Sequence, residues 1–293
     1  MAASEKDGPA FPRPVSLSGG TPQPIRPSAR GVQSIEIGGR LLAALVRSRQ
    51  PMMLRDLAAQ AGLTPGQAHA YLVSFRKLEI VEQDAATGRY QLGPFALHLG
   101  LARQRSTDAV RLATAAAPAL AEKTDLMTVV TVWGSGGATV VYVEEAANQI
   151  LINVKPGITY SIIGTATGKV FAAFLPPKIV DPAVGRELQN LNLIQQAGGP
   201  VDPDALRAEI ASIRRRGYAT TVDRPIPGLT AISAPVFDFT NRMQLAVTLI
   251  GPSQFVDTAP QSAPLAELLS AAKTLSAQLG YVPESESPKA GNS

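Results

Sequence analysis

The sequence predicts an α+β protein with two folded parts, a small helical unit closed by a β-hairpin and a larger part built on an antiparallel sheet. Two patterns predict this organisation. Between residues 33 and 78, apolar side chains recur at helical spacing. From residue 127 onward the pattern changes to short strands with helices between them, which is typical of α+β folds. The 293 residues, 45% of them hydrophobic, suffice for one small and one medium domain.

The N-terminal part predicts a helix-turn-helix. Residues 1–31 are rich in Pro, Ser and Gly and are expected to form a disordered tail. One helix is expected over residues 33–48, and a second runs from residue 54 to a turn at Gly62. Thr64 suits the N-cap of a third helix, with Pro65 at its first position and Gln67 completing a capping box. A helix in this arrangement fits the major groove of DNA.

The third helix has two contrasting faces. Its apolar stripe, which is expected to face the core, consists of Ala68, Tyr71, Leu72, Phe75 and Leu78. Residues 80–83 and 89–92 alternate around Gly88, which predicts a hairpin and completes a winged helix-turn-helix. The residues expected to meet DNA lie on the opposite face of the helix and at the base of the hairpin: Gly66, Gln67, His69, Ala70, Ser74, Lys77 and Arg89. For His69, a solvated position without DNA contact is an equal alternative.

The distribution of charge favours a polyanionic partner for the N-terminal part. Residues 1–92 contain 11 Lys and Arg against 7 Asp and Glu, whereas residues 93–293 contain 16 of each. The whole net charge of +4 therefore lies in the part that is expected to contact DNA. A chance excess on a flexible tail and a small domain is the alternative.

The C-terminal part begins with a helical linker over residues 97–120, interrupted at Ser106 and Thr107, capped again by Asp108 and ending close to Pro118. Strands are expected over 127–133, 138–143, 150–154, 218–223, 231–237 and 244–250. Helices are expected over 168–175, 202–216 and 265–279, and residues 284–293 form a polar tail. Four aromatic residues are expected in the core, with a place in a pocket wall as the alternative: Trp133, Tyr142, Tyr160 and Phe171.

Composition argues against an enzyme. The chain has no cysteine, and both histidines, His69 and His98, precede residue 100. The part that follows the linker therefore cannot build a Ser-His or Cys-His nucleophile or a His/Cys metal site, and we expect no cofactor and no metal. No apolar run is long enough for a signal peptide or a membrane span, so a cytoplasmic protein is expected.

Over about residues 32–281 the chain resembles the IclR family of bacterial transcription regulators. Three segments carry the resemblance. The first segment consists of residues 61–63, Ala68-His69 and residues 90–93. The second is residues 164–173. The third starts at Arg216-Gly-Tyr-Ala219 and continues through Gly228 to residues 231–238 and 246–252. The resemblance implies a tail (1–31), a winged helix-turn-helix domain (32–95), a linker helix (96–121), a GAF-like effector-binding domain (122–281) and a second tail (282–293). It also implies dimers, or dimers of dimers, on palindromic DNA sites, and a small organic acid as effector.

The resemblance implies a site for the effector carboxylate and also marks departures from the family. Backbone amides at Thr165, Ala166 and Thr167 would bind it, and Gly168 is expected in the same site. The polar positions of the family map to Thr221 (often Asp), Ala231 (often Cys), Thr248 and Ile250 (often Ser). An acidic residue of the family is replaced by Arg224, a candidate carboxylate partner or an ordinary surface arginine. We therefore expect a larger, partly apolar or aromatic acid. On the third helix, Ala70 replaces an arginine that usually follows the histidine.

The sequence thus predicts a DNA-binding transcription regulator whose affinity for a palindromic operator is modulated by an organic acid. The alternative is a ligand-binding or oligomerising module whose winged helix binds protein instead of DNA.

Overall fold

The computed structural model describes residues 31–48, 50–146, 154–190, 199 and 201–283, which form two compact units. The first contains the residues up to Leu78 together with Glu82–Leu92. The second contains Glu79–Val81 and the residues from Gly93 on. Among the described residues, no helix combines the length and the apolar character needed to cross a bilayer.

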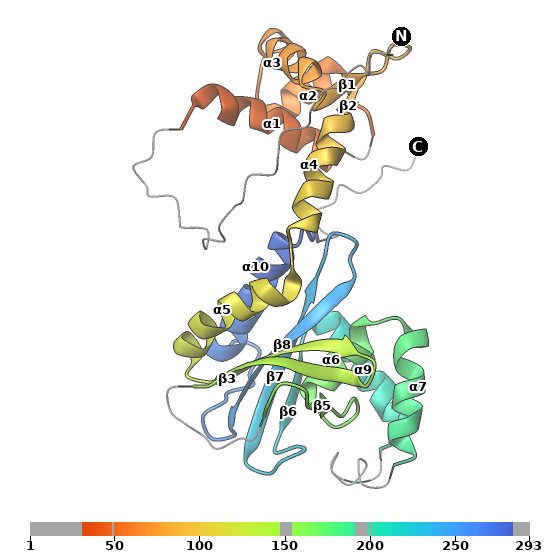
Figure 1. Cartoon of the computed structure of the whole chain (residues 1–293), viewed down its shortest axis with the longest axis vertical. Helices are drawn as coiled ribbons and strands as arrows, with labels where there is room; N and C mark the ends of the chain where they lie inside the picture. Colours follow the sequence, from red (N-terminus) through yellow and green to blue (C-terminus); the bar gives the residue numbers. More distant parts are fainter. Residues whose placement is uncertain (1–30, 49, 147–153, 191–198, 200, 284–293) are drawn as a thin grey trace, which may run out of the picture. The chain divides into compact units, whose positions relative to one another are not determined.

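The first unit consists of three helices and a hairpin (Figure 1). The helices are α1 (Gln33–Arg47), α2 (Leu54–Ala61) and α3 (Pro65–Lys77), and the hairpin strands are β1 (Val81–Gln83) and β2 (Tyr90–Leu92). Leu41, Leu57 and Leu72, one from each helix, are fully buried in its core. The helix-turn-helix and the wing that the sequence predicts are therefore confirmed.

The turn between α2 and α3 forms as the residues dictate. Gly62 ends α2 with φ of 67°, a left-handed conformation that glycine adopts without strain. The capping box is complete, because the Gln67 amide donates to Thr64 Oγ1 at 3.3 Å and the Thr64 amide donates to Gln67 Oε1 at 3.0 Å. One expectation is wrong: Leu78, assigned to the apolar stripe, follows the last turn of α3 as its C-cap and is 58% exposed.

The predicted linker is two helices, α4 (Pro94–Arg105) and α5 (Ala109–Thr124). The interruption at Ser106 and Thr107 is confirmed, and the Asp108 carboxylate caps α5 by accepting from the amides of Val110 and Arg111. α5 contains Pro118 within it and ends at Thr124, four residues beyond the predicted end at residue 120. Its buried residues Ala113 and Leu120 belong to the main core of the second unit.

The second unit is built on a six-stranded antiparallel sheet with the order β5-β4-β3-β8-β7-β6. The strands are β3 (Met127–Gly134), β4 (Gly137–Glu144), β5 (Thr159–Tyr160), β6 (Ala219–Val222), β7 (Leu229–Phe237) and β8 (Met243–Pro252). β5 and β6 are thus the two opposite edges of the sheet. Of the predicted strand over 150–154, residues 150–153 lie outside the described residues, and Val154 is not in a strand.

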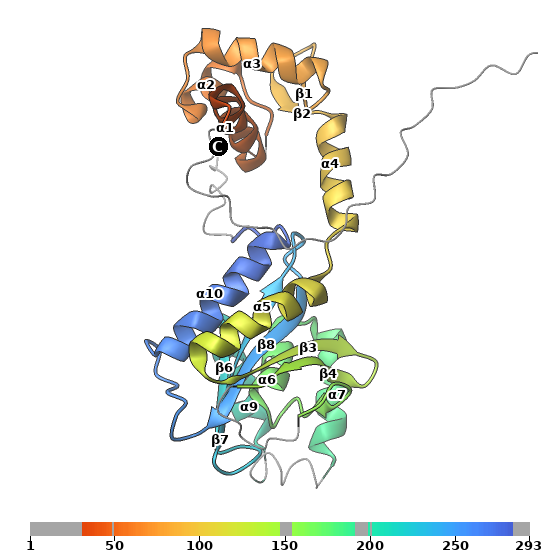
Figure 2. The ribbon, with the colours of Figure 1, turned by 60° about the vertical axis from the view of Figure 1, so that its left-hand side comes forward.

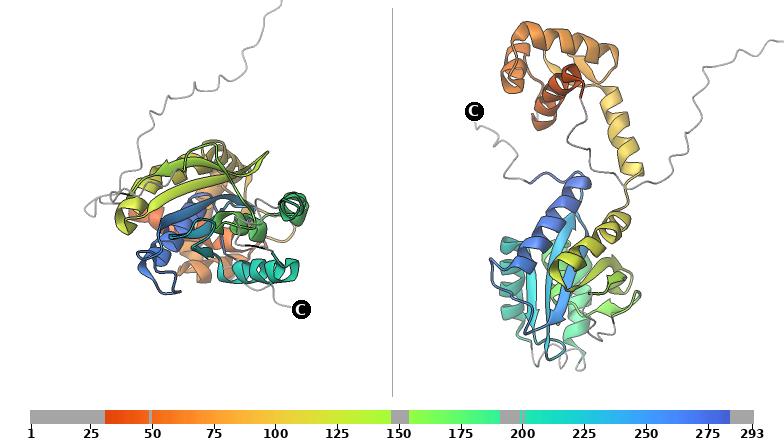
Figure 3. Two further views of the ribbon diagram at one scale, coloured as in Figure 1. Left: turned by 90° about the horizontal axis from the view of Figure 1, so that it is seen from below. Right: turned by 90° about the vertical axis from the view of Figure 1, so that its left-hand side faces the viewer.

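Helices cover both faces of this sheet, as Figures 2 and 3 show. α5 and α10 (Ala263–Gln278) pack on one face, over a core that includes Ile232, Leu249 and Leu268. α6 (Ala166–Phe174) packs on the other face with α9 (Pro203–Arg216) beside it. Successive side chains along β7 and β8 point to opposite faces of the sheet and so enter the two cores in turn. The sheet therefore has a layer of helices on each face.

Two elements of the second unit were not predicted. β5 has two residues, too few to produce an alternating pattern. α7 (Pro177–Leu188) contains two prolines and a glycine, which mark loops in a sequence, but Pro177 occupies the first turn, where its missing N–H is tolerated. Val180 and Ala183 of α7 are buried beside α6.

Candidate functional site

The outer face of α3 is exposed as the sequence predicts. The residues expected to meet DNA on this helix, Gly66, Gln67, His69, Ala70, Ser74 and Lys77, are all solvent-exposed, and its opposite face is buried through Ala68 and Leu72. The helix therefore presents one free face of major-groove size.

Two of the predicted DNA-contacting side chains also have structural roles. Gln67 Oε1 accepts from the Thr64 amide in the capping box, which leaves its NH₂ group to face outward. The Arg89 guanidinium donates to the Pro51 carbonyl oxygen at 3.2 Å and so links the wing to the segment before α2. Arg76, which the sequence did not single out, donates from its guanidinium to Gln83 Oε1 at 3.0 Å and links α3 to β1. The wing is thus held against α3 by side chains.

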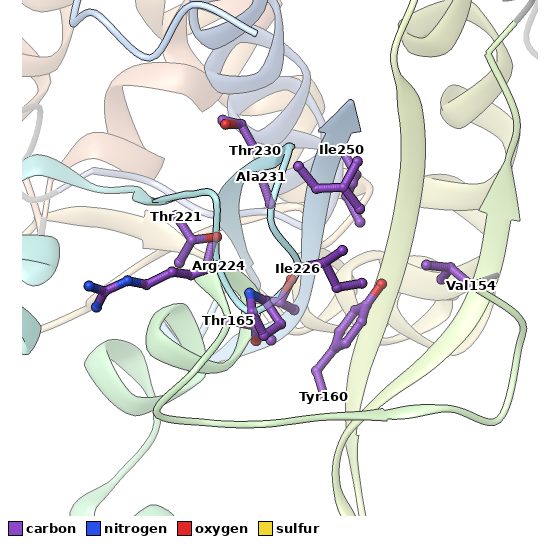
Figure 4. A pocket seen from close by; sticks show the side chains of 13 residues that line it. Val154, Tyr160, Thr165, Thr221, Arg224, Ile226, Thr230, Ala231 and Ile250 are labelled. Carbon is purple, nitrogen blue, oxygen red and sulfur yellow. The ribbon is translucent and has the colours of Figure 1, made fainter. Parts of the chain in front are cut away.

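The second unit contains a cavity of about 80 Å³ between the N-terminus of α6, the loop before β7 and one face of the sheet (Figure 4). Its lining residues are Val154, Tyr160, Thr165, Ala166, Thr167, Thr221, Arg224, Pro225, Ile226, Leu229, Thr230, Ala231 and Ile250. The strand register explains how distant residues meet here. Thr221 on β6 lies beside Ala231 on β7, which lies beside Ile250 on β8, so the three form one lateral row.

The first residues of α6 and its N-cap, Thr165, Ala166 and Thr167, line this cavity. Thr165 is the N-cap, and its hydroxyl accepts from the Gly168 amide at 2.9 Å. Among the described residues, the amides of Ala166 and Thr167 have no acceptor, as expected for the first turn of a helix. Free amides at the positive end of a helix form a site suited to an anion.

Gly168 has a packing role here. It does not line the cavity, although it was expected among the effector-binding residues. A Cβ at this position would lie 2.1 Å from the Ser161 carbonyl oxygen, so only glycine allows the loop before α6 to pass this close.

Thr248 also does not line the cavity, although it was predicted to contact the effector. It lies two residues from Ile250 on the same face of β8, and α6 covers it there. Its hydroxyl donates to Ser233 Oγ at 2.9 Å and accepts from the Thr167 hydroxyl at 2.7 Å, because its single proton is already used. Thr248 therefore attaches α6 to the sheet.

Arg224 lines the cavity but extends away from it. Figure 4 shows its guanidinium pointing away from Tyr160, Ile226 and Ile250. The loop that carries it is closed by Asp223, whose carboxylate accepts from the Gly228 amide at 3.0 Å and from the Ser253 hydroxyl at 2.5 Å. The geometry therefore gives the loop backbone, and not the guanidinium, a place in the cavity wall.

Comparison with known proteins identifies the family to which the chain belongs. The model of the IclR helix-turn-helix domain matches residues 34–85, and that of the bacterial transcriptional regulator IclR C-terminal domain matches residues 104–277. The chain belongs to the IclR family. It is therefore a transcription regulator with a helix-turn-helix domain, and the expectation that it is not an enzyme is confirmed.

Relatives of this IclR-family chain match it along most of its length. The glycerol operon regulatory protein of Streptomyces griseus is 29% identical over 254 residues, which is 85% of this chain and 95% of the relative. The crystal structure of Pseudomonas aeruginosa HmgR is 34% identical with a TM-score of 0.77, and the match covers 85% of this chain and 99% of that one. An IclR homolog from Microbacterium hydrocarbonoxydans, complexed with 4-hydroxybenzoate, has the same fold at 19% identity and a TM-score of 0.50, over 84% and 99% of the two chains.

The structure of this IclR-family protein adds cavity residues that the sequence did not assign. Val154, Pro225, Ile226, Leu229 and Thr230 line the cavity. Most are apolar loop or edge residues, so no periodic pattern marks them. Of the four aromatic residues for which a pocket position was the alternative, Tyr160 is in the cavity wall. Phe171 is buried in the core, with its ring centroid 5.6 Å from that of Trp133.

Two hydroxyl groups in the cavity wall are left without a partner. Thr221 is 6% exposed, and both its Oγ1 and the Tyr160 hydroxyl are buried with no hydrogen bond among the described residues. Burial raises the pKa of Tyr160 above its usual range, so the phenol remains protonated. Within the described part of the chain, no three His, Asp or Glu side chains gather as they would around a metal ion.

Proposed function

We propose that this protein binds a specific operator through the exposed face of α3 and the wing, and that a small organic acid in the cavity of the second unit changes its affinity for DNA. The observation that carries the first part is the capped, one-side-buried α3 with its exposed outer residues. The positive excess of residues 1–92 supports it, because contacts to phosphates supply most of the affinity of such domains.

The carboxylate of the effector would bind at the N-terminus of α6. The free amides of Ala166 and Thr167 support this placement, and the nearby Thr221 hydroxyl supplies a further donor. We do not assign Arg224 to the carboxylate, because its guanidinium extends away from the cavity. The rest of the wall is mostly apolar, so the body of the acid would be apolar as well.

The cavity is only partly enclosed, so its walls do not set the length of the acid. An aromatic ring or a short apolar chain can extend from the carboxylate site along the apolar wall. Such an effector can change DNA affinity only by binding one conformation of the protein better than another.

The protein would bind its operator as a dimer. α4 has no buried residue, and its leucines and phenylalanine face solvent along the whole helix. Apolar surface of this extent is uncommon on a monomer and is usually covered by a partner. A second copy would bring two α3 helices to two half-sites, as a palindromic operator requires.

DNA binding is tested by fluorescence anisotropy with a labelled fragment from upstream of the protein's own gene and a random fragment of equal length. We expect preference for the upstream fragment, and affinity that falls steeply between about 50 and 200 mM salt. Lys77→Ala should weaken binding, whereas Lys273→Ala on α10, also exposed, should not. Equal binding to both fragments at the higher salt concentration would contradict an operator-specific regulator.

The effector is tested in the same assay with benzoate, phenylacetate, pentanoate and their hydroxylated analogues. An acid that fits should shift the anisotropy curve on the upstream fragment and raise the melting temperature of the protein. If no acid does either, the proposed effector class is wrong even if DNA binding is specific.

A further inference from the structure

Tyr160 and Thr221 reach the cavity from opposite edges of the sheet. Tyr160 is on β5 and Thr221 is on β6, and four strands separate them. Both line the same cavity, so the curled sheet brings its two edges to one site. Figure 4 shows the Tyr160 hydroxyl directed toward the space beside Ile226 and Ile250, with Thr221 on the other side of the view.

The Tyr160 hydroxyl has no partner in the described part of the protein, although its oxygen is buried. A hydroxyl that loses its water without gaining a hydrogen bond destabilises the folded chain. Tyr160 packs in one apolar cluster with Val154 and Ile250, and Figure 4 shows its hydroxyl on the side of Ile226. Because Tyr160 lines the cavity, a group bound there is placed to supply the missing partner.

The partner of the Tyr160 hydroxyl has a restricted chemistry. Among the described lining residues, the one cation, Arg224, points away from Tyr160, so a second carboxylate there would be buried among apolar side chains, which is strongly unfavourable. The phenol itself stays neutral, because burial raises the pKa of Tyr160. A neutral group such as a hydroxyl or a carbonyl satisfies the phenol without this penalty.

We propose that Tyr160 determines effector specificity by hydrogen bonding to a neutral polar group at the end of the effector opposite its carboxylate. This rests on the proposed function, which places the carboxylate at the N-terminus of α6. The effector is then a hydroxy- or oxo-monocarboxylic acid with an apolar body, and plain acids and dicarboxylic acids of the same length bind more weakly.

The test uses isothermal titration of the full-length protein with acid pairs that differ by one hydroxyl: benzoate against 3- and 4-hydroxybenzoate, and pentanoate against 5-hydroxypentanoate. The wild type should bind a hydroxylated member about tenfold more tightly than its plain partner, the magnitude expected for one buried hydrogen bond. In Tyr160→Phe the preference should disappear, while affinity for the plain acid is kept or improved.

A control variant and a stability measurement distinguish a role of Tyr160 in effector binding from a general effect of removing a phenol. Tyr142→Phe removes a phenol that bonds to Glu144 and does not line the cavity, so the preference for the hydroxylated acid should remain. Tyr160→Phe without ligand should melt at the same temperature as the wild type or higher, because it loses an unpaired group.

The outcomes separate the two proposals. Binding of the plain acids with no preference for any hydroxylated member, or a preference that survives in Tyr160→Phe, overturns the role of Tyr160 and leaves the carboxylic effector standing. Binding of no acid in the panel overturns the proposed effector class and the role of Tyr160 with it.

Discussion

At the scale of single residues, two threonines on the same face of the sheet have different roles. Thr221 and Thr248 are both buried, and the family resemblance assigned both to the effector. Only Thr221 lines the cavity, whereas Thr248 is covered by α6 and fully hydrogen-bonded. The sequence predicts which face of a strand a residue occupies, because side chains alternate. It does not predict which part of that face a helix will cover.

The same Thr→Val substitution is therefore expected to have opposite effects on stability at these two positions. Thr248→Val breaks two buried hydrogen bonds and leaves Thr167 without its acceptor, so it should lower the free energy of unfolding by about 1–3 kcal/mol. Thr221→Val removes a hydroxyl that has no partner and should leave stability unchanged or raise it. Urea denaturation of both variants checks this. Equal destabilisation would show that the Thr221 hydroxyl is paired in solution.

Thr221→Val should also weaken effector binding, since its hydroxyl is expected to bond to the carboxylate. Loss of one such bond predicts a rise in Kd of about tenfold for an acid that the wild type binds. Isothermal titration with benzoate or its hydroxylated analogues provides the measurement. An unchanged Kd would remove Thr221 from the effector site and leave the amides of α6 as the carboxylate donors.

At the scale of elements, α7 fixes the loop that leads into α6. The Glu187 carboxylate accepts from the Ser161 hydroxyl at 2.8 Å and from the amides of Ile162 and Ile163 at 2.9 and 3.1 Å. Through this loop, α7 positions the amides that line the cavity. α7 was not predicted, because its two prolines resemble loop signals when the contacts that stabilise the helix are unknown.

Glu187→Ala should therefore weaken acid binding, although Glu187 does not line the cavity. Loss of a carboxylate that accepts from two amides and a hydroxyl should lower the free energy of unfolding by about 1–3 kcal/mol and weaken acid binding. Glu187→Gln keeps one acceptor oxygen in place and should recover most of the affinity. Denaturation and titration of both variants test this. Normal acid affinity in Glu187→Ala would mean that the loop is held by other contacts.

The glycines of α6 and α7 provide a second test at this scale. Gly168→Ala places a Cβ against the backbone of Ser161 and Ile162, so it should destabilise the protein by about 2 kcal/mol or more. Gly185→Ala on α7 meets nothing within 4 Å and should stabilise the helix by about 0.5–1 kcal/mol. Thermal melts of the two variants should therefore shift in opposite directions. A tolerated Gly168→Ala would show that the loop before α6 moves easily.

At the scale of the whole molecule, the order of elements was largely predictable, because long periodic segments and caps mark them. The helix-turn-helix, the wing, α9, α10 and the strands β3, β4, β6, β7 and β8 follow from such local signals. The cavity does not, because its walls come from both edges of the sheet and from loops without a pattern. Its composition is set by strand order, which the sequence does not state.

The exposed apolar residues of α4 lead to the last prediction, which concerns assembly. Leu97 is 63% exposed on this helix, and Leu99 and Leu101 are exposed beside it. If a second copy covers them, Leu97→Glu should place a charge in the interface and shift the protein toward the monomer. Light scattering after size exclusion should then give a mass near 30.7 kDa, in contrast to about twice that or more for the wild type.

Phe255→Glu is the matched control for this experiment. Phe255 is 69% exposed in a turn after β8, so it is as apolar and accessible as Leu97 but lies on a different element. This variant should keep the mass of the wild type. The Leu97→Glu monomer should also lose affinity for a two-half-site operator, because each half-site then binds separately without the gain from linkage. A wild type that is monomeric at assay concentration, with full operator affinity, would contradict the dimer and with it the palindromic site.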